Sequence, residues 1–349
     1  MFPYWLLFAY FAGGALLSKT LRGPHRPPSP FLVAGMVLIA LMIGLRYEVG
    51  ADWDSYKLIF SYAGYVDLER AIRLGDPGYQ MMNWTVRNMG GEFWVVNFIG
   101  AVIFSWGLFR FAQVQPSPWL AILVAVPYLV IVVAMGYARQ AIAIGVLMAG
   151  LAAVQRGAST LRFAFYVLVA AFFHKTAVFV LPLVIFSNER NRLVNMLGGI
   201  IAIYMLYNSF LADSVENLVR NYIGTEYSSQ GAAVRVAMNL VPAAIYFLSW
   251  RRLGFSDRER RLWFFHSVAA LGFLVLLLML PSSTAVDRLA LYVMPLQIAI
   301  LARMPMVLGP RAGTILVLAY SFAVQFVWLN FATHARYWVP YQFYPLLGL

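Results

Sequence analysis

The chain has 349 residues, of which 62% are hydrophobic and 11% are charged, whereas soluble domains carry roughly 45–50% apolar and about 25% charged residues. This composition excludes an ordinary soluble domain and predicts an all-α fold, a polytopic transmembrane helix bundle. No cysteine is present and the four histidines are scattered, which excludes disulfide and thiolate metal sites and argues against a multi-histidine metal centre.

Ten apolar runs predict full membrane spans, because a helix needs about 20 apolar residues to cross a hydrocarbon core of ~30 Å. The first run lacks the basic start and cleavage site of a signal peptide, so we expect it to be retained. We expect one integral membrane domain over 1–349. The predicted spans lie near 2–18, 31–46, 94–112, 118–136, 138–155, 193–212, 235–250, 262–281, 285–302 and 313–331.

The segment 161–187 does not fit a simple crossing, because His174 and Lys175 interrupt its apolar sequence at the midpoint. A single crossing would put the basic cluster of residues 251–261 on the outer side, against the positive-inside rule. Two half-helices of about 13 residues, each rising about 20 Å, keep every basic cluster on one side. The sequence therefore predicts a re-entrant or broken helix pair, with its tip in a water-filled cavity open to the outside.

The net charge of +12 is unevenly divided between the two sides of this topology. The inner connections hold 15 of the 26 Lys and Arg and 3 of the 14 Asp and Glu, and the outer segments hold 11 of each. Positive-inside orientation explains this distribution, and nucleic-acid binding is not expected. The outer side is neutral but densely charged, so we expect the function there.

Two extracytoplasmic loops are predicted, over residues 47–93 and 213–234. In the first loop, apolar residues from Tyr56 to Ala63 recur at helical spacing and predict a short amphipathic helix at the interface. Asp76 followed by proline predicts the start of a second helix, and Gly90 with the next glycine predicts its end.

Five polar groups stand where predicted spans meet the outer side. Their members are Arg46, Glu48, Asp52, Asp54 and Tyr56; Arg139 and Gln140; His174 and Lys175; Asp287, Arg288 and Tyr292; and Arg336. Arginine at a helix end also snorkels to headgroups and aromatic residues form interfacial belts, which is the better interpretation for Arg336. Asp287 and Arg288 are equally consistent with a structural ion pair. Arg139 and the His174-Lys175 pair are the strongest candidates, because a charge within the bilayer costs about 2.5–3.5 kcal/mol.

A pocket containing Arg46, Arg139, Lys175 and Arg288 suits a phosphate or pyrophosphate, since arginine binds phosphate oxygens bidentately. Each charge-assisted bond contributes roughly 1.5–3 kcal/mol. The apolar body of the protein would hold a lipid tail. The residues alone therefore lead to the hypothesis of a lipid-linked pyrophosphate ligand at the outer leaflet.

The succession of motifs GLRYEVGADWDSY, YARQAIAIGVLM, FFHKTAVFVLP, VDRLALYVMP and RYWVPY resembles the EpsG family of exopolysaccharide polymerases, which are related in function to Wzy-type O-antigen polymerases. The motifs occur in order over nearly the whole chain. The resemblance implies a polymerase of the bacterial inner membrane that joins polyprenyl-pyrophosphate-linked oligosaccharide units, donor and acceptor, on the periplasmic side. Membrane lipid, a chain-length regulator and a flippase are the implied partners.

Glycosyl transfer requires neutralisation of the leaving pyrophosphate and deprotonation of the acceptor hydroxyl. We expect Arg139 and Arg288, helped by Lys175 and Arg46, to bind the pyrophosphate. Asp52 or His174 is the candidate base. No cofactor is expected, and no metal is required if cations neutralise the leaving group. Residues 52–54 nevertheless match a DxD metal motif by letters, so metal dependence stays open.

Three other functions remain compatible with the sequence. An O-antigen ligase, or another polyprenyl-linked glycosyltransferase, would use the same pyrophosphate chemistry with a different acceptor. A membrane acyltransferase also places His and Arg at a membrane face, but its acyl donor should come from the cytoplasmic side, where few functional groups are paired. A transporter or flippase would use broken helices, but it should show internal repeats, and none is evident.

Overall fold

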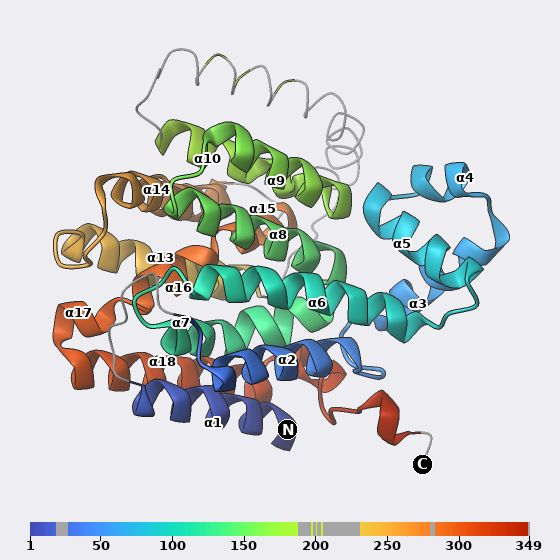
Figure 1. The fold of residues 1–349 in the computed structure, drawn as a ribbon, viewed down its shortest axis with the longest axis horizontal. Helices are drawn as coiled ribbons and strands as arrows, with labels where there is room; N and C mark the ends of the chain where they lie inside the picture. The colour runs from blue at the N-terminus through green and yellow to red at the C-terminus, as the bar shows by residue number, and fades with distance from the viewer. Residues whose placement is uncertain are drawn as a thin grey trace.

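The computed structural model of the protein describes residues 1–18, 27–187, 231–279 and 283–347, together with residues 197, 200 and 204. In these ranges the chain forms helices joined by turns, with one isolated antiparallel bridge between Arg46 and Phe343. The long helices lie side by side in a bundle, and a group of short helices, α3 to α5, lies beyond one end of it (Figure 1). The all-α fold class is confirmed for this part of the chain.

The described residues form the following helices. The first half contains α1 (Phe2–Leu17), α2 (Pro30–Gly44), α3 (Trp53–Tyr62), η1 (Ala63–Tyr65), α4 (Leu68–Arg73), α5 (Pro77–Asn88), α6 (Phe93–Ala112), α7 (Pro118–Ala125), the π-helix η2 (Val126–Ala134) and α8 (Ala138–Gln155). The second half contains α9 (Thr160–Phe173), η3 (Lys175–Phe179), α10 (Val180–Ser187), α13 (Ala232–Ser249), α14 (Asp257–Met279), α15 (Ser283–Ala290), η5 (Leu291–Val293), α16 (Pro295–Leu301), α17 (Met304–Leu308), α18 (Pro310–Phe331), η6 (Thr333–Tyr337) and η7 (Tyr344–Leu346).

Helix ends are set by local chemistry. The Ser29 and Ser159 side chains accept hydrogen bonds from backbone N–H groups three residues later, which satisfies orphan donors at the starts of α2 and α9. Both helices predicted in the loop 47–93 are present, as α3 and α5. After α5 the chain turns at Gly90, whose φ of 78° lies in the region that glycine adopts without strain.

Five helices are long and apolar enough to cross a membrane, or six if the bent pair Ser283–Val293 and Pro295–Leu308 is one span, counting only the described residues. The five are α6, α8, α13, α14 and α18. They correspond to the spans predicted near 94–112, 138–155, 235–250, 262–281 and 313–331. The chain is therefore a multi-pass membrane protein, but the expectation of ten full spans is not supported.

The other predicted spans fail for identifiable reasons. Those near 2–18 and 31–46 are helices of 16 and 15 residues, which rise only about 22–24 Å. The span near 118–136 changes from α-helix to π-helix at Val126, and the span near 285–302 is bent by 43°. The predicted span 193–212 lies almost entirely outside the described residues, as does most of the loop 213–234.

The predicted break in 161–187 is present at His174, whose extended backbone separates α9 from η3 and α10. Both ends of this segment meet the first turn of α14. The Arg258 guanidinium donates to the Ala158 carbonyl, and Arg261 Nε donates to the Ser187 carbonyl at 3.1 Å. The two halves therefore enter the bundle and return to the same end, which is the geometry of a re-entrant pair.

Helices α6 and α8 approach each other closely through glycine. A methyl group added at Gly107 would overlap the backbone carbonyl of Gly145 on the facing helix. Small residues permit such close approach between membrane helices and the van der Waals packing that follows from it. This pair fixes the position of α8, whose first turn contributes to the candidate site.

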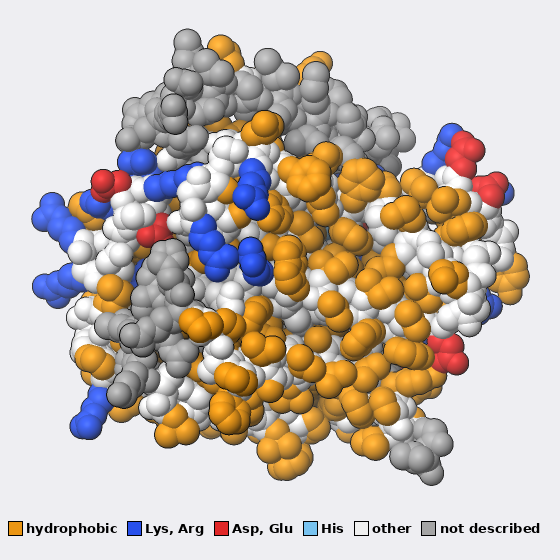
Figure 2. All heavy atoms as spheres, in the orientation of Figure 1, with side chains coloured by type: hydrophobic (Ala, Val, Ile, Leu, Met, Phe, Trp, Pro, Cys, Tyr) orange, Lys and Arg blue, Asp and Glu red, His pale blue; other side chains and the backbone are white. Residues whose placement is uncertain are grey.

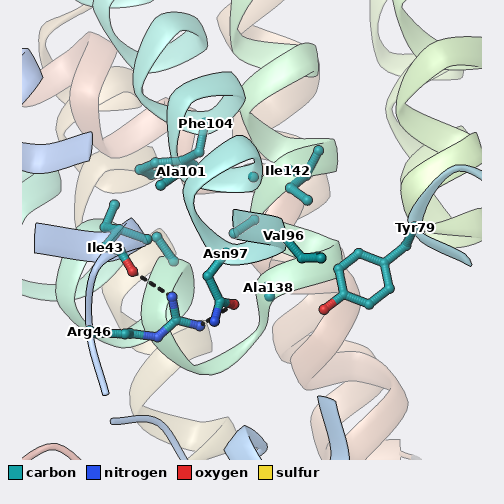
Figure 3. A pocket seen from close by; sticks show the side chains of 12 residues that line it. Ile43, Arg46, Tyr79, Val96, Asn97, Ala101, Phe104, Ala138 and Ile142 are labelled. Atoms are coloured by element: carbon teal, nitrogen blue, oxygen red, sulfur yellow. Dashed lines mark hydrogen bonds between the residues drawn. The ribbon is translucent and has the colours of Figure 1, made fainter. Parts of the chain in front are cut away.

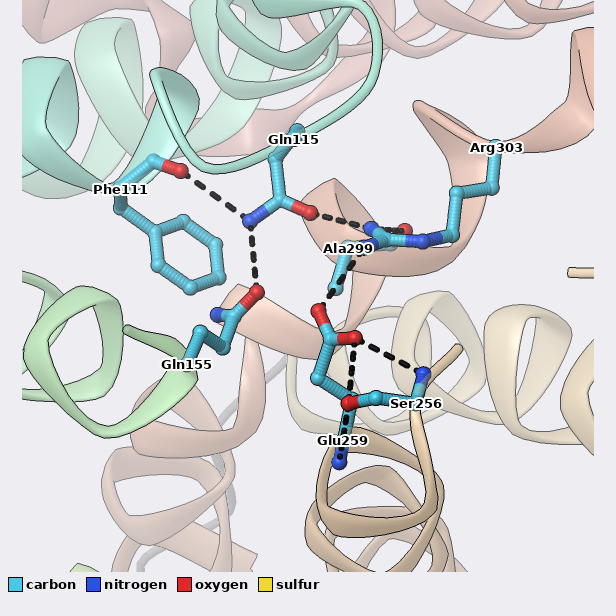
Figure 4. A network of polar contacts seen from close by, with 7 residues as sticks. All are labelled: Phe111, Gln115, Gln155, Ser256, Glu259, Ala299 and Arg303. Atoms are coloured by element: carbon cyan, nitrogen blue, oxygen red, sulfur yellow. Dashed lines mark hydrogen bonds and ion pairs between the residues drawn. The ribbon is translucent and has the colours of Figure 1, made fainter. Parts of the chain in front are cut away.

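A polar network lies at the end of the bundle where α14 begins (Figure 4). The Arg303 guanidinium is buried, and it donates to the Glu259 carboxylate at 3.1 Å and to the Gln115 side chain. Gln115 in turn donates to the Phe111 carbonyl at 3.1 Å and lies 3.5 Å from the Gln155 side chain. The network joins the ends of α6, α8, α14 and α16.

Hydrophobic side chains cover the middle of the face shown in Figure 2. Lys and Arg gather at its left, where α13, α14 and α17 lie, whereas acidic and basic side chains occur together at the right around α4. A belt of this kind between two charged ends is typical of a membrane protein.

Candidate functional site

The Asp76 carboxylate is the centre of a polar cluster where α5 meets α8 and the re-entrant pair. Asp76 precedes α5 at the predicted helix start, but its side chain makes no capping bond. Instead it accepts a hydrogen bond from Arg139 Nη1 at 2.8 Å and from the backbone N–H of Lys175 at 3.2 Å. Only 5% of its side chain is exposed, against 34% for Arg139. A buried carboxylate therefore joins α5, the first turn of α8 and the tip of the re-entrant pair, defined as residues 174–176.

The tip adds an imidazole and a hydroxyl to this cluster. His174 Nδ1 lies 3.7 Å from Asp76 Oδ2, and the two form an ion pair when the ring is protonated. The Thr176 hydroxyl lies 3.1 Å from that of Tyr292, which follows α15. The α5 backbone approaches closely here, because a methyl group at Gly78 would lie 3.1 Å from the Phe172 carbonyl oxygen. The tip is thus held between α5 and the α15 segment.

The charges around Asp76 determine its protonation. Burial by itself raises the pKa of this carboxyl, but the His174 ring, the Arg139 guanidinium and the Lys175 N–H stabilise the anion. The net result is a pKa below the ordinary aspartate value. Asp76 therefore stays ionised at neutral pH.

Asp52 occupies the N-cap position of α3 without making a capping bond. Its side chain is half-buried, and burial raises the pKa of the carboxyl above its ordinary value. The positive charges of Arg288 and Arg139 oppose this shift without cancelling it. Asp52 therefore lies within electrostatic range of two arginines and is a stronger base than an exposed aspartate.

Arg288 is exposed and lies within electrostatic range of Asp52. Its backbone carbonyl is hydrogen-bonded to a side chain of α8. Gln140 Nε2 donates to the Arg288 carbonyl at 2.6 Å. Arg139 stacks over the Tyr56 ring at 5.9 Å, and Tyr56 packs edge-on against Tyr79 at 5.5 Å. The first turn of α8 therefore positions both a cation of its own and one of α15.

Most of the predicted site residues thus gather around Asp76. Those with a contact or an electrostatic interaction in the cluster are Asp52, Tyr56, Arg139, Gln140, His174, Lys175, Arg288 and Tyr292. Their chemical roles stay predictions.

The remaining predicted residues lie apart from this cluster. Asp287 does not pair with its neighbour in sequence, because both its oxygens bind the buried Arg235 of α13. Glu48 and Asp54 are exposed, and Arg336 is exposed with its guanidinium 3.2 Å from the Tyr337 hydroxyl. Arg46 is buried, with hydrogen-bond acceptors of its own.

Sequence reasoning missed two charged residues of this region. Asp76 was interpreted only as the start of a helix, and Arg235 was not singled out, although it is the first residue of the predicted span 235–250. The signal for Arg235 was a charge at the edge of an apolar run, where it needs water or a partner. Among the described residues no three His, Asp or Glu side chains converge as metal ligands would.

Comparison with protein families gives a match over nearly the whole chain. The model described as the EpsG family matches residues 31–343. Comparison with curated proteins and with solved structures gives no significant match.

Proposed function

The chain belongs to the EpsG family, whose members have an exopolysaccharide polymerase role, and we propose that it transfers a growing glycan from a lipid pyrophosphate to a sugar hydroxyl of another lipid-linked repeat unit. The observation that carries the proposal is that Arg139 and Arg288 lie within electrostatic range of the Asp52 carboxylate, beside the re-entrant tip that includes Lys175. Cations for a leaving pyrophosphate and a base for an acceptor hydroxyl are the two requirements of glycosyl transfer.

Three cations bind the pyrophosphate in this proposal. Arg139 Nη1 is bound to Asp76 and its Nε is buried, but 34% of the side chain is exposed. The Lys175 and Arg288 side chains have no recorded ion pair within the described ranges, and Arg288 is exposed. Asp76 holds Arg139 in place and leaves part of its guanidinium to the ligand. Arg46 is not part of this set, because it is buried and engaged elsewhere.

Asp52 is the base that takes the proton of the acceptor hydroxyl. Burial raises the pKa of its carboxyl, which strengthens it as a base. His174 faces Asp76 through Nδ1, so its Nε2 is the ring nitrogen left for a pyrophosphate or sugar oxygen. The acceptor proton passes to Asp52, the new glycosidic bond forms at the anomeric carbon, and the bond to the lipid pyrophosphate breaks.

The cluster faces the periplasmic side of a bacterial inner membrane in this proposal. Positive-inside orientation supports it, because the end of the bundle rich in Lys and Arg belongs in the cytoplasm. The tip of the re-entrant pair and the helices α3 to α5 then lie on the outer side, where a lipid-linked donor and acceptor are presented after they have been flipped.

The test is polymerisation in proteoliposomes with a synthetic polyprenyl-pyrophosphate-linked repeat unit, read as a glycan ladder. Asp52→Asn should lower the rate about 100-fold or more through loss of the base, and Arg288→Gln about 10–100-fold through loss of one charge-assisted bond. Glu69→Gln and Arg87→Gln, both at exposed positions away from the cluster, are the matched controls.

Two results would contradict the proposal. Full-length ladders from both Asp52→Asn and Arg288→Gln, at normal protein levels, would exclude this site. Transfer of the glycan to lipid A with no growth of the ladder would identify a ligase instead.

A further inference from the structure

Arg46 is a buried cation whose hydrogen bonds go to neutral groups. Its residue exposure is 2%, and it lies between the end of α2 and the start of α6. Nε donates to the Val49 carbonyl at 3.1 Å, Nη1 to the Ile43 carbonyl at 2.5 Å, and Nη2 to Asn97 Oδ1 at 3.4 Å. These three bonds use three of the five N–H groups of the guanidinium.

No carboxylate among the described residues forms an ion pair with Arg46. The side chains that act most on its charge are those of Tyr4, Tyr56, Tyr79 and Tyr341. Burial raises the pKa of the Tyr56 and Tyr79 hydroxyls, so neither supplies a tyrosinate. A buried charge without a counterion is strongly unfavourable. The described part of the protein thus supplies the cation and no anion.

A small cavity of about 10 Å³ adjoins the guanidinium, lined by Arg46, Tyr79, Asn97 and apolar residues of α6 and α8. Each of its polar lining side chains can donate a hydrogen bond. Tyr79 Oη and Asn97 Nδ2 are buried without a partner, and Figure 3 shows the Tyr79 hydroxyl directed toward the side where Arg46 and Asn97 lie. The Asn97 amide orientation follows from Arg46, which requires the oxygen on its own side and leaves the NH₂ group for the cavity.

We propose that this cavity binds a monovalent, monatomic anion of the chloride type, which serves as the counterion of Arg46. The anion accepts hydrogen bonds from the guanidinium, the Asn97 amide and the Tyr79 hydroxyl together. A water molecule would also need acceptors for its own protons, and the lining side chains offer only two oxygens, of which Asn97 Oδ1 already accepts from Arg46. The volume is about that of a single water-sized particle, which leaves no room for phosphate or sulfate.

Bromide is the probe, because it replaces chloride and scatters anomalously. The full-length protein is crystallised in bromide, and its melting temperature is measured in sodium chloride, sodium bromide and sodium gluconate at equal ionic strength. We expect one bromine peak beside the Arg46 guanidinium, and a Tm about 2–5 °C higher in either halide than in gluconate.

Variants separate specific binding from a general salt effect. Arg46→Met should abolish the halide dependence of Tm, and Tyr79→Phe, which keeps the charge, should weaken halide affinity about 3–10-fold. Arg87→Met removes an exposed arginine of α5 and should keep the full halide response. Water-like density with no bromine peak, equal Tm values in chloride and gluconate, or an Arg46→Met protein that still responds to halide would each overturn the proposal.

Discussion

Asp76 Oδ2 lies 2.8 Å from Arg139 Nη1, although the two residues are 63 positions apart in the sequence. This pair joins α5 to α8 of the bundle. The same carboxylate accepts the Lys175 N–H, so one side chain determines how α5, α8 and the tip sit together. Asp76 thereby positions a cation of the candidate site without belonging to the sequence motifs that predicted the site.

Asp76→Asn should destabilise the protein, because it leaves Arg139 without its anionic partner. We expect a cost of about 2–3 kcal/mol in the free energy of unfolding, less than for a fully buried pair because Arg139 is one-third exposed. The Tm in detergent measures this loss. In a double-mutant cycle with Arg139→Gln the two costs should not add, and simple additivity would show that the pair is not coupled.

The contribution of Asp76 to stability should depend on pH in a defined direction. The pKa of its carboxyl is lowered in the folded protein, so the contribution is present above the unfolded value of about 3.9 and is lost as the pH falls through the folded pKa. The Tm difference between the wild type and Asp76→Asn should therefore be largest near neutral pH and shrink below about pH 4. A constant difference across that range would contradict this assignment.

The pH dependence of polymerisation should report the pKa of Asp52. The base must be ionised, so activity should fall on the acid side at a higher pH than the ordinary aspartate value of about 3.9. Arg288→Gln removes a positive charge that lowers this pKa and should move the acid limb to still higher pH. Arg87→Gln should leave the limb unchanged, and an unshifted limb in Arg288→Gln would argue against Asp52 as the base.

Alanine substitution should change stability in opposite directions at two glycines, one in the close contact between α6 and α8 and one outside it. Gly107→Ala forces the helices apart and should cost about 3 kcal/mol. Gly272, in α14, has no heavy atom within 4 Å of an added methyl group, so Gly272→Ala should be neutral or stabilise by up to about 1 kcal/mol. Thermal unfolding of the two variants in the same detergent gives the comparison, and equal effects would mean that the close contact is absent.

The polar network in Figure 4 predicts a large loss of stability when Glu259 is replaced. Glu259→Gln removes the carboxylate that faces the buried Arg303 and should cost about 3 kcal/mol. Asp257→Asn, two residues earlier, removes an exposed carboxylate paired with Arg260 and should cost less than about 1 kcal/mol. A Tm loss of similar size in both variants would contradict the importance of burial here.

The sequence was informative wherever a local signal determined the structure. Apolar length identified the five long spans, and the polar His174-Lys175 step identified the break between α9 and α10. The same criterion overcounted spans, because apolar composition does not reveal a π-helix such as Val126–Ala134 or a helix of 15 residues. The π-helix and the short helix depend on packing against other helices, and the spacing of apolar residues in the sequence carries no information about that packing.

Partners distant in sequence could not be predicted in this way. Asp76 and the Lys175 N–H are 99 residues apart, and Arg235 and Asp287 are 52 residues apart. Adjacency suggested that Asp287 pairs with Arg288, yet the fold gives it to another helix. Arg46 shows the same limit, since its motif predicted a ligand-binding cation and its burial is a property of the tertiary structure.

The re-entrant pair is anchored at both of its ends to the first turn of α14. The Ala158 and Ser187 carbonyls accept hydrogen bonds from two arginines of α14, Arg258 and Arg261, which lie one helical turn apart. The two arginines of α14 therefore hold both ends of the segment whose tip carries His174.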